Sequence, residues 1–190
     1  MFSDEFLYKV NKSIRCIDCN DIEKLVNVLF DVRKFGRLFI IGSGGGAGHA
    51  SHAVCDFRKL CNFEAYAPYD NVSELTARTN DEGYDTTIIN WLKVSKFNQK
   101  DCIFVFSVGG GKDGVSENIT KALRYARGMD ARIVGVVGRD GGTTKELADA
   151  CVLIDCVDYV TPITEGLQGV IFHLLVSHPK LAINKTKWES

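Results

Sequence analysis

Short apolar runs rich in β-branched residues alternate with helical segments along most of the chain. Four of these runs have the length and composition of buried strands: RLFIIG (37–42), CIFVFS (102–107), RIVGVVG (132–138) and CVLID (151–155). Strands of this kind, separated by helices, form parallel sheets that helices cover on both faces. The pattern therefore predicts an α/β fold with a doubly wound parallel sheet.

The segments that connect the strands have apolar residues at helical spacing. We expect one helix through His52 and Arg58, a second from Ser116 to Arg127, and a short third near 145–148. Each of these helices follows a predicted strand through a loop. Those loops therefore lie at the carboxyl ends of the strands, where open parallel sheets bind their ligands.

Both ends of the chain are expected to be helical. Residues 3–34 have the periodicity of one or two helices, with Asn20 or Asp21 as the N-cap of the second. The last apolar segment, 161–176, is expected to form a helix that ends before Pro179, and the polar residues 184–190 are expected to be frayed. With 190 residues the chain fits one domain, which we divide into N-terminal helices (1–35), an α/β core (36–178) and a tail (179–190).

Charge and composition exclude several functions. A formal net charge of −1 and a pI near 6.4 leave no basic surplus for general nucleic-acid binding, which favours a small-molecule partner. No apolar run approaches the roughly 20 residues that span a bilayer, and the N-terminus lacks the pattern of a signal peptide. We therefore expect a cytoplasmic protein with no membrane association.

The seven cysteines are expected to be reduced thiols in that compartment. Four of them lie in or beside apolar segments and are predicted to be core residues: Cys55, Cys102, Cys151 and Cys156. Cys16 and Cys19 have the spacing of a redox or metal motif, but no second pair completes a zinc site.

Two glycine-rich loops follow successive long strands and are the first candidates for a binding site. The first predicts phosphate contacts from Ser43, Gly44, Gly45 and Gly46, and the second from Ser107, Gly109, Gly110 and Lys112. Glycines let backbone N–H groups approach an oxyanion closely, and the N-terminus of the following helix favours negative charge. Tight turns alone would explain one such loop, but two loops on successive strands favour phosphate binding.

Nucleotide-binding motifs fit these loops poorly. A dinucleotide fingerprint would place its last glycine at Ala47 and its acidic residue at Glu64, in a weak strand. Neither loop ends in the Gly-Lys-Ser/Thr of a Walker motif. A nucleotide-dependent oxidoreductase is therefore the weaker interpretation.

His52 and Asp56 lie four residues apart on the helix that follows the first loop, and so share one face of it. A surface ion pair is the simplest interpretation of this spacing. The neighbouring residues are mostly small or apolar, however, and predict a largely buried helix. Buried charged groups are costly, which favours a functional pair.

Four segments together resemble the phosphoheptose isomerases, SIS-domain enzymes that convert sedoheptulose 7-phosphate to a manno-heptose 7-phosphate. They are GSGGGAGHASHAVCD (42–56), NVSELTARTNDEGYD (71–85), the loop that begins at Ser107, and GVVGRDGG (135–142). The resemblance covers about residues 37–176. It implies a flavodoxin-like three-layer sandwich, a phosphorylated seven-carbon sugar as substrate, and homotetramers whose interfaces use the N-terminal helices and the 80–85 segment.

The chain departs from the family pattern in both glycine loops. The family's asparagine and serine in the first loop become Ser43 and Gly46, and hydroxyl residues after Ser107 become Val108, Gly109 and Gly110. The resemblance then implies that backbone N–H groups or Lys112 bind the phosphate. The family's substrate-binding aspartate before the 80–85 segment corresponds to Asn71, with Asp70 beside it.

In its C-terminal helix the family has a glutamine and, eight residues later, a histidine. Glu165 and His173 keep this spacing, whereas a second register would place Phe172 at the histidine position; we favour the first because it retains the imidazole. Eight residues span roughly 12 Å of helix, so the two side chains must lean together or the first turn must be irregular. A core histidine is the alternative for His173.

The resemblance implies that His52, Asp56, Glu165 and His173 bind zinc or a similar divalent metal. Isomerisation moves a proton between adjacent carbons through an enediol, and we expect Asp56 or Glu165 to carry the proton while the metal and His173 stabilise the enediolate. An isomerase of another sugar phosphate and a non-catalytic SIS protein are the alternatives.

Overall fold

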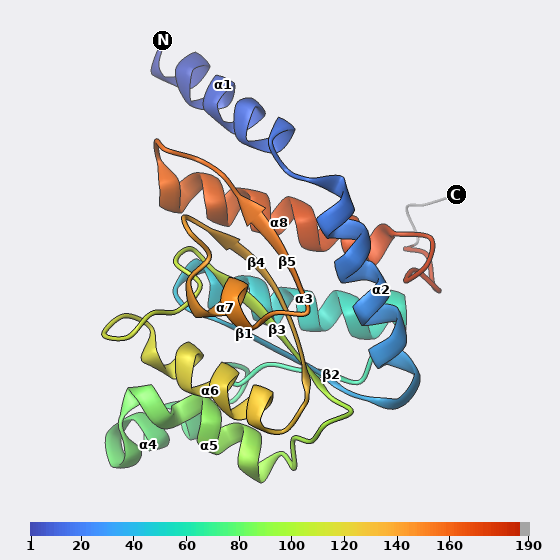
Figure 1. Ribbon diagram of the computed structural model, residues 1–190, viewed down its shortest axis with the longest axis vertical. Coiled ribbons are helices and arrows are strands. Elements are labelled where there is room, and N and C mark those ends of the chain that lie inside the picture. The colour runs from blue at the N-terminus through green and yellow to red at the C-terminus, as the bar shows by residue number, and fades with distance from the viewer. Residues whose placement is uncertain (187–190) are drawn as a thin grey trace.

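The computed structural model describes residues 1–186 (Figure 1). Five parallel strands form one sheet in the order β2-β1-β3-β4-β5, which is a flavodoxin-like order. Their bounds are β1 Leu38–Gly42, β2 Ala65–Tyr66, β3 Cys102–Ser107, β4 Arg132–Gly138 and β5 Ala150–Ile154. The predicted doubly wound α/β fold is therefore confirmed, with a two-residue edge strand beside β1.

Helices cover both faces of the sheet. One face packs against α2 (Cys19–Phe35), α3 (Gly45–Cys61) and α8 (Val160–Ser177), and the other against α5 (Thr87–Val94), α6 (Glu117–Gly128) and α7 (Gly142–Leu147). In β1, Leu38 and Ile40 face the first layer while Phe39 and Ile41 face the second. Because both faces are covered, β1 and β3 are buried along their whole length, which explains their continuous apolar sequence.

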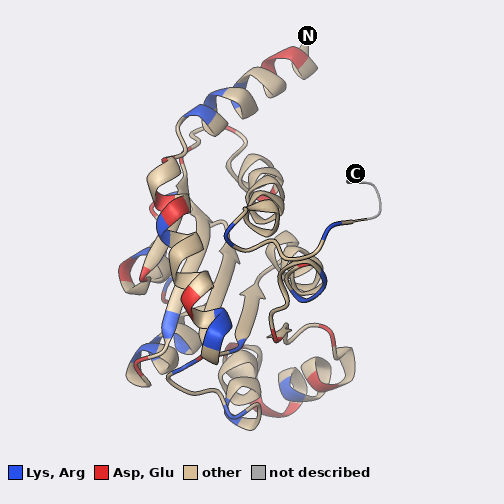
Figure 2. Cartoon of the chain, turned by 90° about the vertical axis from the view of Figure 1, so that its right-hand side faces the viewer, with Lys and Arg blue, Asp and Glu red and all other residues tan. Residues whose placement is uncertain are grey.

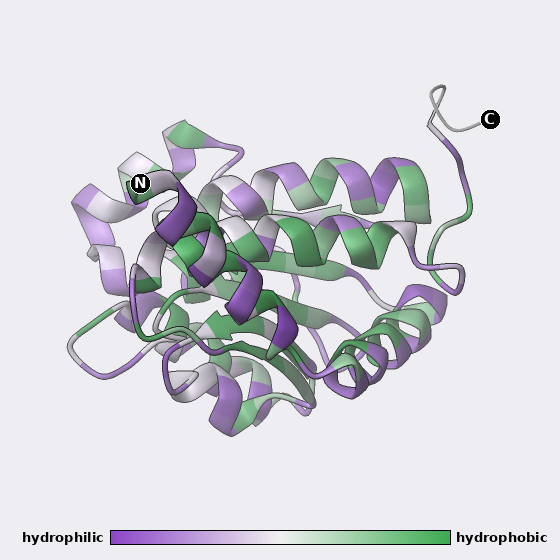
Figure 3. Cartoon of the chain, turned by 90° about the horizontal axis from the view of Figure 1, so that it is seen from above, coloured by the Kyte–Doolittle hydropathy of each residue, from purple (hydrophilic) through white to green (hydrophobic). Residues whose placement is uncertain are grey.

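The surface carries the charge of the molecule and the sheet carries almost none. In Figure 2 the strands are nearly free of the Lys, Arg, Asp and Glu colours, which lie on the surrounding helices and loops. Figure 3 shows the strands as an apolar layer between helices with one apolar and one polar side. Among residues 1–186, no helix combines the length and apolar character that crossing a membrane requires.

Two helices lie at the N-terminus, and the first extends away from the body of the protein (Figure 1). α1 (Phe2–Arg15) leaves the side chains of Phe2, Leu7 and Tyr8 largely exposed. The N-cap of α2 is Asp18, whose carboxylate accepts the Asn20 N–H at 2.8 Å, and not Asn20 or Asp21 as predicted. The cap lies two to three residues earlier than predicted because α2 already begins at Cys19.

The segment between β2 and β3 contains two helices that the sequence interpretation did not assign. α4 (Val72–Glu82) buries none of its residues, and a 3₁₀ turn (Tyr84–Thr86) links it to α5. The motif that carried the family resemblance there thus forms an exposed helical arm on the α5–α6 side of the sheet (Figure 1).

The chain after α8 is attached to the core, which contradicts the fraying expected from residue 184. Leu181 is fully buried, and the N–H groups of Ile183 and Asn184 donate to the Leu60 carbonyl at 2.9 and 3.0 Å. An apolar anchor followed by backbone hydrogen bonds holds this segment against α3. The rest of the tail expected to fray, residues 187–190, lies outside the described part of the chain.

Candidate active site

The helices α3 and α8 pack side by side and run in the same direction, because each follows a parallel strand on the same face of the sheet (Figure 1). At their N-terminal ends, a Cβ atom built on Gly45 would lie only 2.5 Å from the carboxylate carbon of Glu165. Towards their C-terminal ends, the Cys61 thiol lies 3.5 Å from the Val176 carbonyl oxygen. Residues at equal distances along the two helices therefore meet.

This packing brings together His52, Asp56 and His173. The Oδ2 atom of Asp56 lies 3.5 Å from Nε2 of His52 and 3.7 Å from Nε2 of His173, and one ligand atom from each residue lies within 4.8 Å of the others. The histidine side chains are about half exposed, and Asp56 is mostly buried. Two imidazoles and a carboxylate thus form a group open to solvent on one side.

Neighbouring groups orient both imidazoles. Nδ1 of His173 lies 2.7 Å from the Gly169 carbonyl oxygen, so we assign the ring proton to Nδ1, which leaves the Nε2 lone pair directed at Asp56. The ring of His52 packs edge-on against Phe172, with 5.0 Å between centroids. Phe172 is fully buried. This favours the alignment register in which His173, and not Phe172, stands at the histidine position of the family.

The three residues have the chemistry of a divalent-metal site. In tetrahedral zinc sites, with metal–ligand distances of roughly 2.0–2.1 Å, neighbouring ligand atoms lie about 3.3 Å apart. The two distances from Asp56 exceed that value only slightly, and all three ligand atoms lie within 4.8 Å of one another, so side-chain rotations would complete the geometry. Three protein ligands and an open position are the usual composition of a catalytic zinc site.

Glu165 does not belong to this group. Among residues 1–186, the set of possible metal ligands contains His52, Asp56 and His173 alone. Glu165 lies two turns before His173 on a regular helix, a rise of roughly 12 Å, and its carboxylate instead rests on Gly45 at the start of α3. The expectation that Glu165 leans towards His173 as a fourth ligand is therefore not met.

A cleft of about 460 Å³ lies at the carboxyl ends of β1, β3 and β4, where the two glycine loops meet. Five of the predicted phosphate-binding residues line it, namely Ser43, Gly44, Ser107, Gly109 and Lys112. Six further residues complete the lining: Val108, Gly111, Val115, Ser116, Arg139 and Thr161. The loops after three neighbouring strands and the first turn of α8 thus share one cavity.

Three predicted glycines do not line this cleft. A Cβ atom on Gly46 would lie 2.2 Å from the Phe106 carbonyl oxygen, and one on Gly110 would lie 1.8 Å from the Gly141 carbonyl oxygen. Both glycines therefore permit close backbone packing rather than access to a ligand. Gly45 is exposed, with the Glu165 carboxylate beside it, and does not belong to the lining.

Asn71 also has a different place from the one predicted. It is exposed at the N-terminus of α4, where its side-chain oxygen accepts the Glu74 N–H at 3.2 Å. Asn71 is thus the N-cap of α4 and does not line the cleft.

The first loop is held by a residue that the sequence interpretation missed. The Gly42 N–H donates to the Tyr69 hydroxyl oxygen at 3.0 Å, and the Tyr69 hydroxyl donates to the Gly42 carbonyl. Burial raises the pKa of Tyr69 well above its usual value, so the phenol stays protonated and keeps this donor. An isolated tyrosine outside any strand gave no sequence signal for this contact.

Arg139, Ser116 and Thr161 were also missed as lining residues. Arg139 lies within the GVVGRDGG segment that contributed to the resemblance, directly after β4. Its position at the carboxyl end of a predicted strand was the signal that could have identified it. Ser116 and Thr161 lie at the starts of α6 and α8, where the same rule applies.

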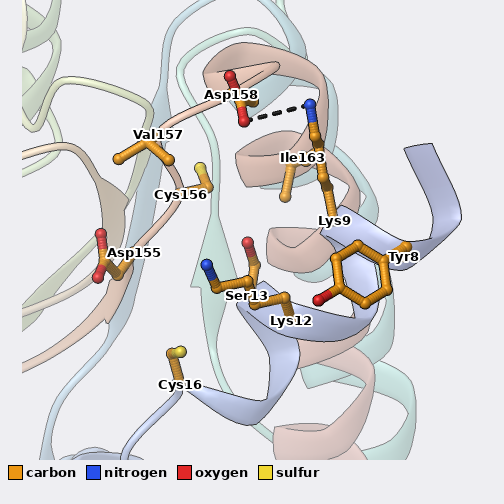
Figure 4. A pocket seen from close by; sticks show the side chains of 10 residues that line it. All are labelled: Tyr8, Lys9, Lys12, Ser13, Cys16, Asp155, Cys156, Val157, Asp158 and Ile163. Carbon is orange, nitrogen blue, oxygen red and sulfur yellow. Dashed lines mark ion pairs between the residues drawn. The ribbon is translucent and has the colours of Figure 1, made fainter. Parts of the chain in front are cut away.

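A second cavity, of about 200 Å³, lies between α1 and the loop that precedes α8 (Figure 4). Lys9 and Asp158 form an ion pair at its edge with an N–O distance of 3.2 Å, and Cys16 and Cys156 line it. Cys16 and Cys19 are both exposed and belong to no group of possible metal ligands within residues 1–186. Cys55 is exposed as well, contrary to its predicted core position, because it lies on the outer face of α3.

Comparison with known proteins places the chain among isomerases of phosphorylated heptoses. No family model matches it. A probable phosphoheptose isomerase from Thermoplasma volcanium is 30% identical over 179 residues, which are 91% of this chain and 88% of that protein. The phosphoheptose isomerase from Helicobacter hepaticus is 31% identical over 81% of this chain and 78% of that protein. The structure of phosphoheptose isomerase GmhA from Neisseria gonorrhoeae matches with a TM-score of 0.76 and 21% identity, over 93% of this chain and 97% of that one. The similarity in sequence, over nearly the full length of both chains, shows that this chain belongs to the phosphoheptose isomerase family.

Proposed function

We propose that the protein is an aldose–ketose isomerase that converts D-sedoheptulose 7-phosphate to D-glycero-D-manno-heptose 7-phosphate. The observation that carries this proposal is the convergence of His52, Asp56 and His173 from two helices. Family membership supplies the substrate class, since the relatives are named as phosphoheptose isomerases. A protein that only bound a sugar phosphate would have no use for two solvent-facing imidazoles around one carboxylate.

We assign His52, Asp56 and His173 as the ligands of zinc or a similar divalent cation. Such a cation, when bound, acts as a Lewis acid that polarises the carbonyl group of a sugar. Asp56 supplies the negative charge of the site, and the Gly169 carbonyl keeps Nε2 of His173 free to bind. Asp56 has one methylene fewer than the glutamate of the family pattern, and the short distance to both imidazoles shows that the carboxylate still reaches them.

Glu165 is the residue to which we assign proton transfer between C1 and C2. Its half-buried carboxylate lies over Gly45, next to the cleft residue Gly44, and is separate from the metal ligands. Such a carboxylate can take the proton from C1 of the ketose and return it to C2 of the enediol, provided that substrate binding closes the gap of about two helical turns that separates Glu165 from the metal ligands here. Asp56 lies between two imidazoles, which favours a ligand role for it.

The cleft is where we place the phosphate of the substrate. Hydroxyl groups of Ser43, Ser107, Ser116 and Thr161 line it, and the N-termini of α3, α6 and α8 border it. Hydroxyl donors and helix N-termini both stabilise a phosphate dianion. The Ser116 side chain makes no capping hydrogen bond to α6, which leaves its hydroxyl group for a ligand.

We further propose a cytoplasmic homotetramer that makes heptose for a surface polysaccharide such as lipopolysaccharide or capsule. Exposed Phe2, Leu7 and Tyr8 give α1 an apolar surface suited to contact between subunits. The half-exposed histidines and the exposed α4 arm suggest that a neighbouring subunit, through residues 80–85, closes the site. Sedimentation analysis of the purified protein tests the tetramer.

The test of the function is turnover of sedoheptulose 7-phosphate together with metal analysis. We expect zinc to bind the wild-type protein at one ion per chain, and His52→Ala and His173→Ala to lose both zinc and activity by about 100-fold or more. His178→Ala is the matched control, because His178 lies at the end of α8 and contacts Glu23. Full activity in the His52 and His173 variants would disprove the site.

Turnover of other phosphorylated ketoses of five to seven carbons separates this proposal from an isomerase with a different substrate. If the wild-type protein binds these sugars without converting any of them, it is a sugar-phosphate-binding protein instead.

A further inference from the structure

The cleft has a positive and asymmetric charge. Lys112 and Arg139 are its two charged lining residues, and no carboxylate lines it. The Lys112 ammonium group forms an ion pair with Asp140, which lies outside the lining. Lys112 therefore already has a carboxylate partner within the protein.

Arg139, by contrast, has no partner for its guanidinium group among residues 1–186. The adjacent carboxylate of Asp140 is occupied at both oxygens, because Oδ2 pairs with Lys112 and Oδ1 accepts the Gly142 N–H at 3.3 Å. Arg139 is also exposed at the cleft. A permanently charged, bidentate donor is thus free to bind an anion there.

The backbone conformation of Arg139 also indicates a functional position. Its φ is 54°, in the left-handed region that residues with a side chain rarely adopt. Ser116, on the neighbouring loop of the cleft, has φ 58°, and Tyr159, two residues before Thr161, has φ 47°. Strained residues occur at functional sites, and two of them, Arg139 and Ser116, stand on neighbouring loops that line this cavity.

We infer that Arg139 binds the phosphate group of the substrate and supplies the charge that the second glycine loop lacks. The inference rests on the proposed function. Val108, Gly109 and Gly110 stand where the family pattern has hydroxyl residues, and Lys112 is committed to Asp140. Arg139, with the Ser107 and Ser116 hydroxyl groups, binds the phosphate in their place.

The test compares Arg139→Gly, Arg139→Lys and the control Lys96→Gly, which removes a positive charge from another exposed residue with a positive φ, outside the cleft lining. Glycine removes the guanidinium group and also suits a positive φ, so this variant is expected to fold at least as well as the wild type. Affinity for inorganic phosphate and for sedoheptulose 7-phosphate is measured by calorimetry, and KM and kcat by turnover. We expect Arg139→Gly to weaken binding and raise KM by about 10- to 100-fold with little change in kcat, Arg139→Lys to recover part of the loss, and Lys96→Gly to change binding less than about threefold.

Equal phosphate affinity in Arg139→Gly and wild type would overturn the inference, as would an equal loss in Lys96→Gly or a wild-type protein that does not bind phosphate. Failure of the proposed function looks different. In that case the wild type binds phosphate through Arg139 but does not convert sedoheptulose 7-phosphate, and the inference about Arg139 stands.

Discussion

Nε2 of His173 lies 3.7 Å from Oδ2 of Asp56, although the two residues belong to the helices that follow the first and the last strands of the chain. The contact exists because α3 and α8 pack in parallel on one face of the sheet. The same packing places Glu165 at the start of α3, two helical turns from the histidines. Metal binding and proton transfer are thereby assigned to different carboxylates.

Glu165→Gln separates these two roles. The amide has nearly the same size as the carboxylate but cannot accept a proton from carbon, so we expect kcat to fall by about 100-fold or more. The zinc content is expected to stay at the wild-type value, since the Glu165 carboxylate lies outside the group formed by His52, Asp56 and His173. Metal analysis and steady-state kinetics of the same preparation check both statements.

Asp56→Asn is the matched comparison for this variant. It removes the charge between the two imidazoles, and we expect it to lose zinc as well as activity. Loss of zinc in Glu165→Gln would show that Glu165 is a ligand after all, and wild-type kcat in that variant would remove it from the reaction.

Alanine substitutions at Gly46 and Gly48 are expected to have opposite effects on stability, although the two glycines lie only two residues apart on α3. A Cβ atom on Gly46 would meet the Phe106 carbonyl oxygen at 2.2 Å, whereas one on Gly48 would meet nothing within 4 Å. We expect Gly46→Ala to lower the free energy of unfolding by about 1–3 kcal/mol and Gly48→Ala to raise it by about 0.5–1 kcal/mol. Chemical denaturation of both variants measures the difference, and a tolerated Gly46→Ala would contradict the close packing.

Asn71 is predicted to act as a helix cap. Asn71→Ala leaves the Glu74 N–H without its partner, and we expect a loss of about 1 kcal/mol in stability with faster hydrogen exchange in α4. Asn71→Asp keeps the capping oxygen and is expected to restore both values. A rise in KM with unchanged stability in Asn71→Ala would instead favour the substrate contact that the family pattern implies.

The cysteines are predicted to react in two groups. Cys16, Cys19 and Cys55 are exposed, while burial raises the pKa of Cys61 to about 11 and that of Cys151 to about 12. Because the thiolate is the reactive form, a thiol with a pKa near 11 is only about one part in a thousand reactive at pH 8. Titration with a chromogenic disulfide at pH 8 is expected to show three fast thiols in the native protein and seven after denaturation, with the buried or half-buried Cys61, Cys102, Cys151 and Cys156 reacting more slowly.

Slow reaction of all seven thiols in the native protein would contradict the exposure of Cys16, Cys19 and Cys55. Cysteine-to-serine variants of these three residues then identify which thiol is protected.

The sheet and its covering helices could be predicted from the sequence because buried elements have apolar residues in a recognisable pattern. β1, β3 and β4 are continuous apolar runs, and α3 and α6 carry apolar residues at helical spacing. α4 has no such apolar pattern, since none of its residues is buried. Its start was nevertheless marked by Asn71 with Glu74 three residues later, which is a capping signature.

The candidate site was most directly predictable where its residues are close in sequence. His52 and Asp56 share one helix, so their spacing alone places them together. The position of Glu165 depends on how α8 packs on α3, which local sequence does not specify, whereas Arg139 follows a predicted strand directly. Gly46 and Gly110 were misjudged for a related reason, because the carbonyl groups they approach belong to distant segments.

The backbone of α3 is fixed at both ends by other segments. Gly46 touches the carbonyl of Phe106 at one end, and at the other the Arg33 side chain donates to the Cys61 carbonyl at 3.3 Å. His52 and Asp56 therefore stand on a scaffold that exists before any ion arrives, and an ion needs to order only side-chain torsions. Unlike a zinc finger, which folds around its metal, this chain is expected to keep its structure after chelation and to regain its ion without refolding.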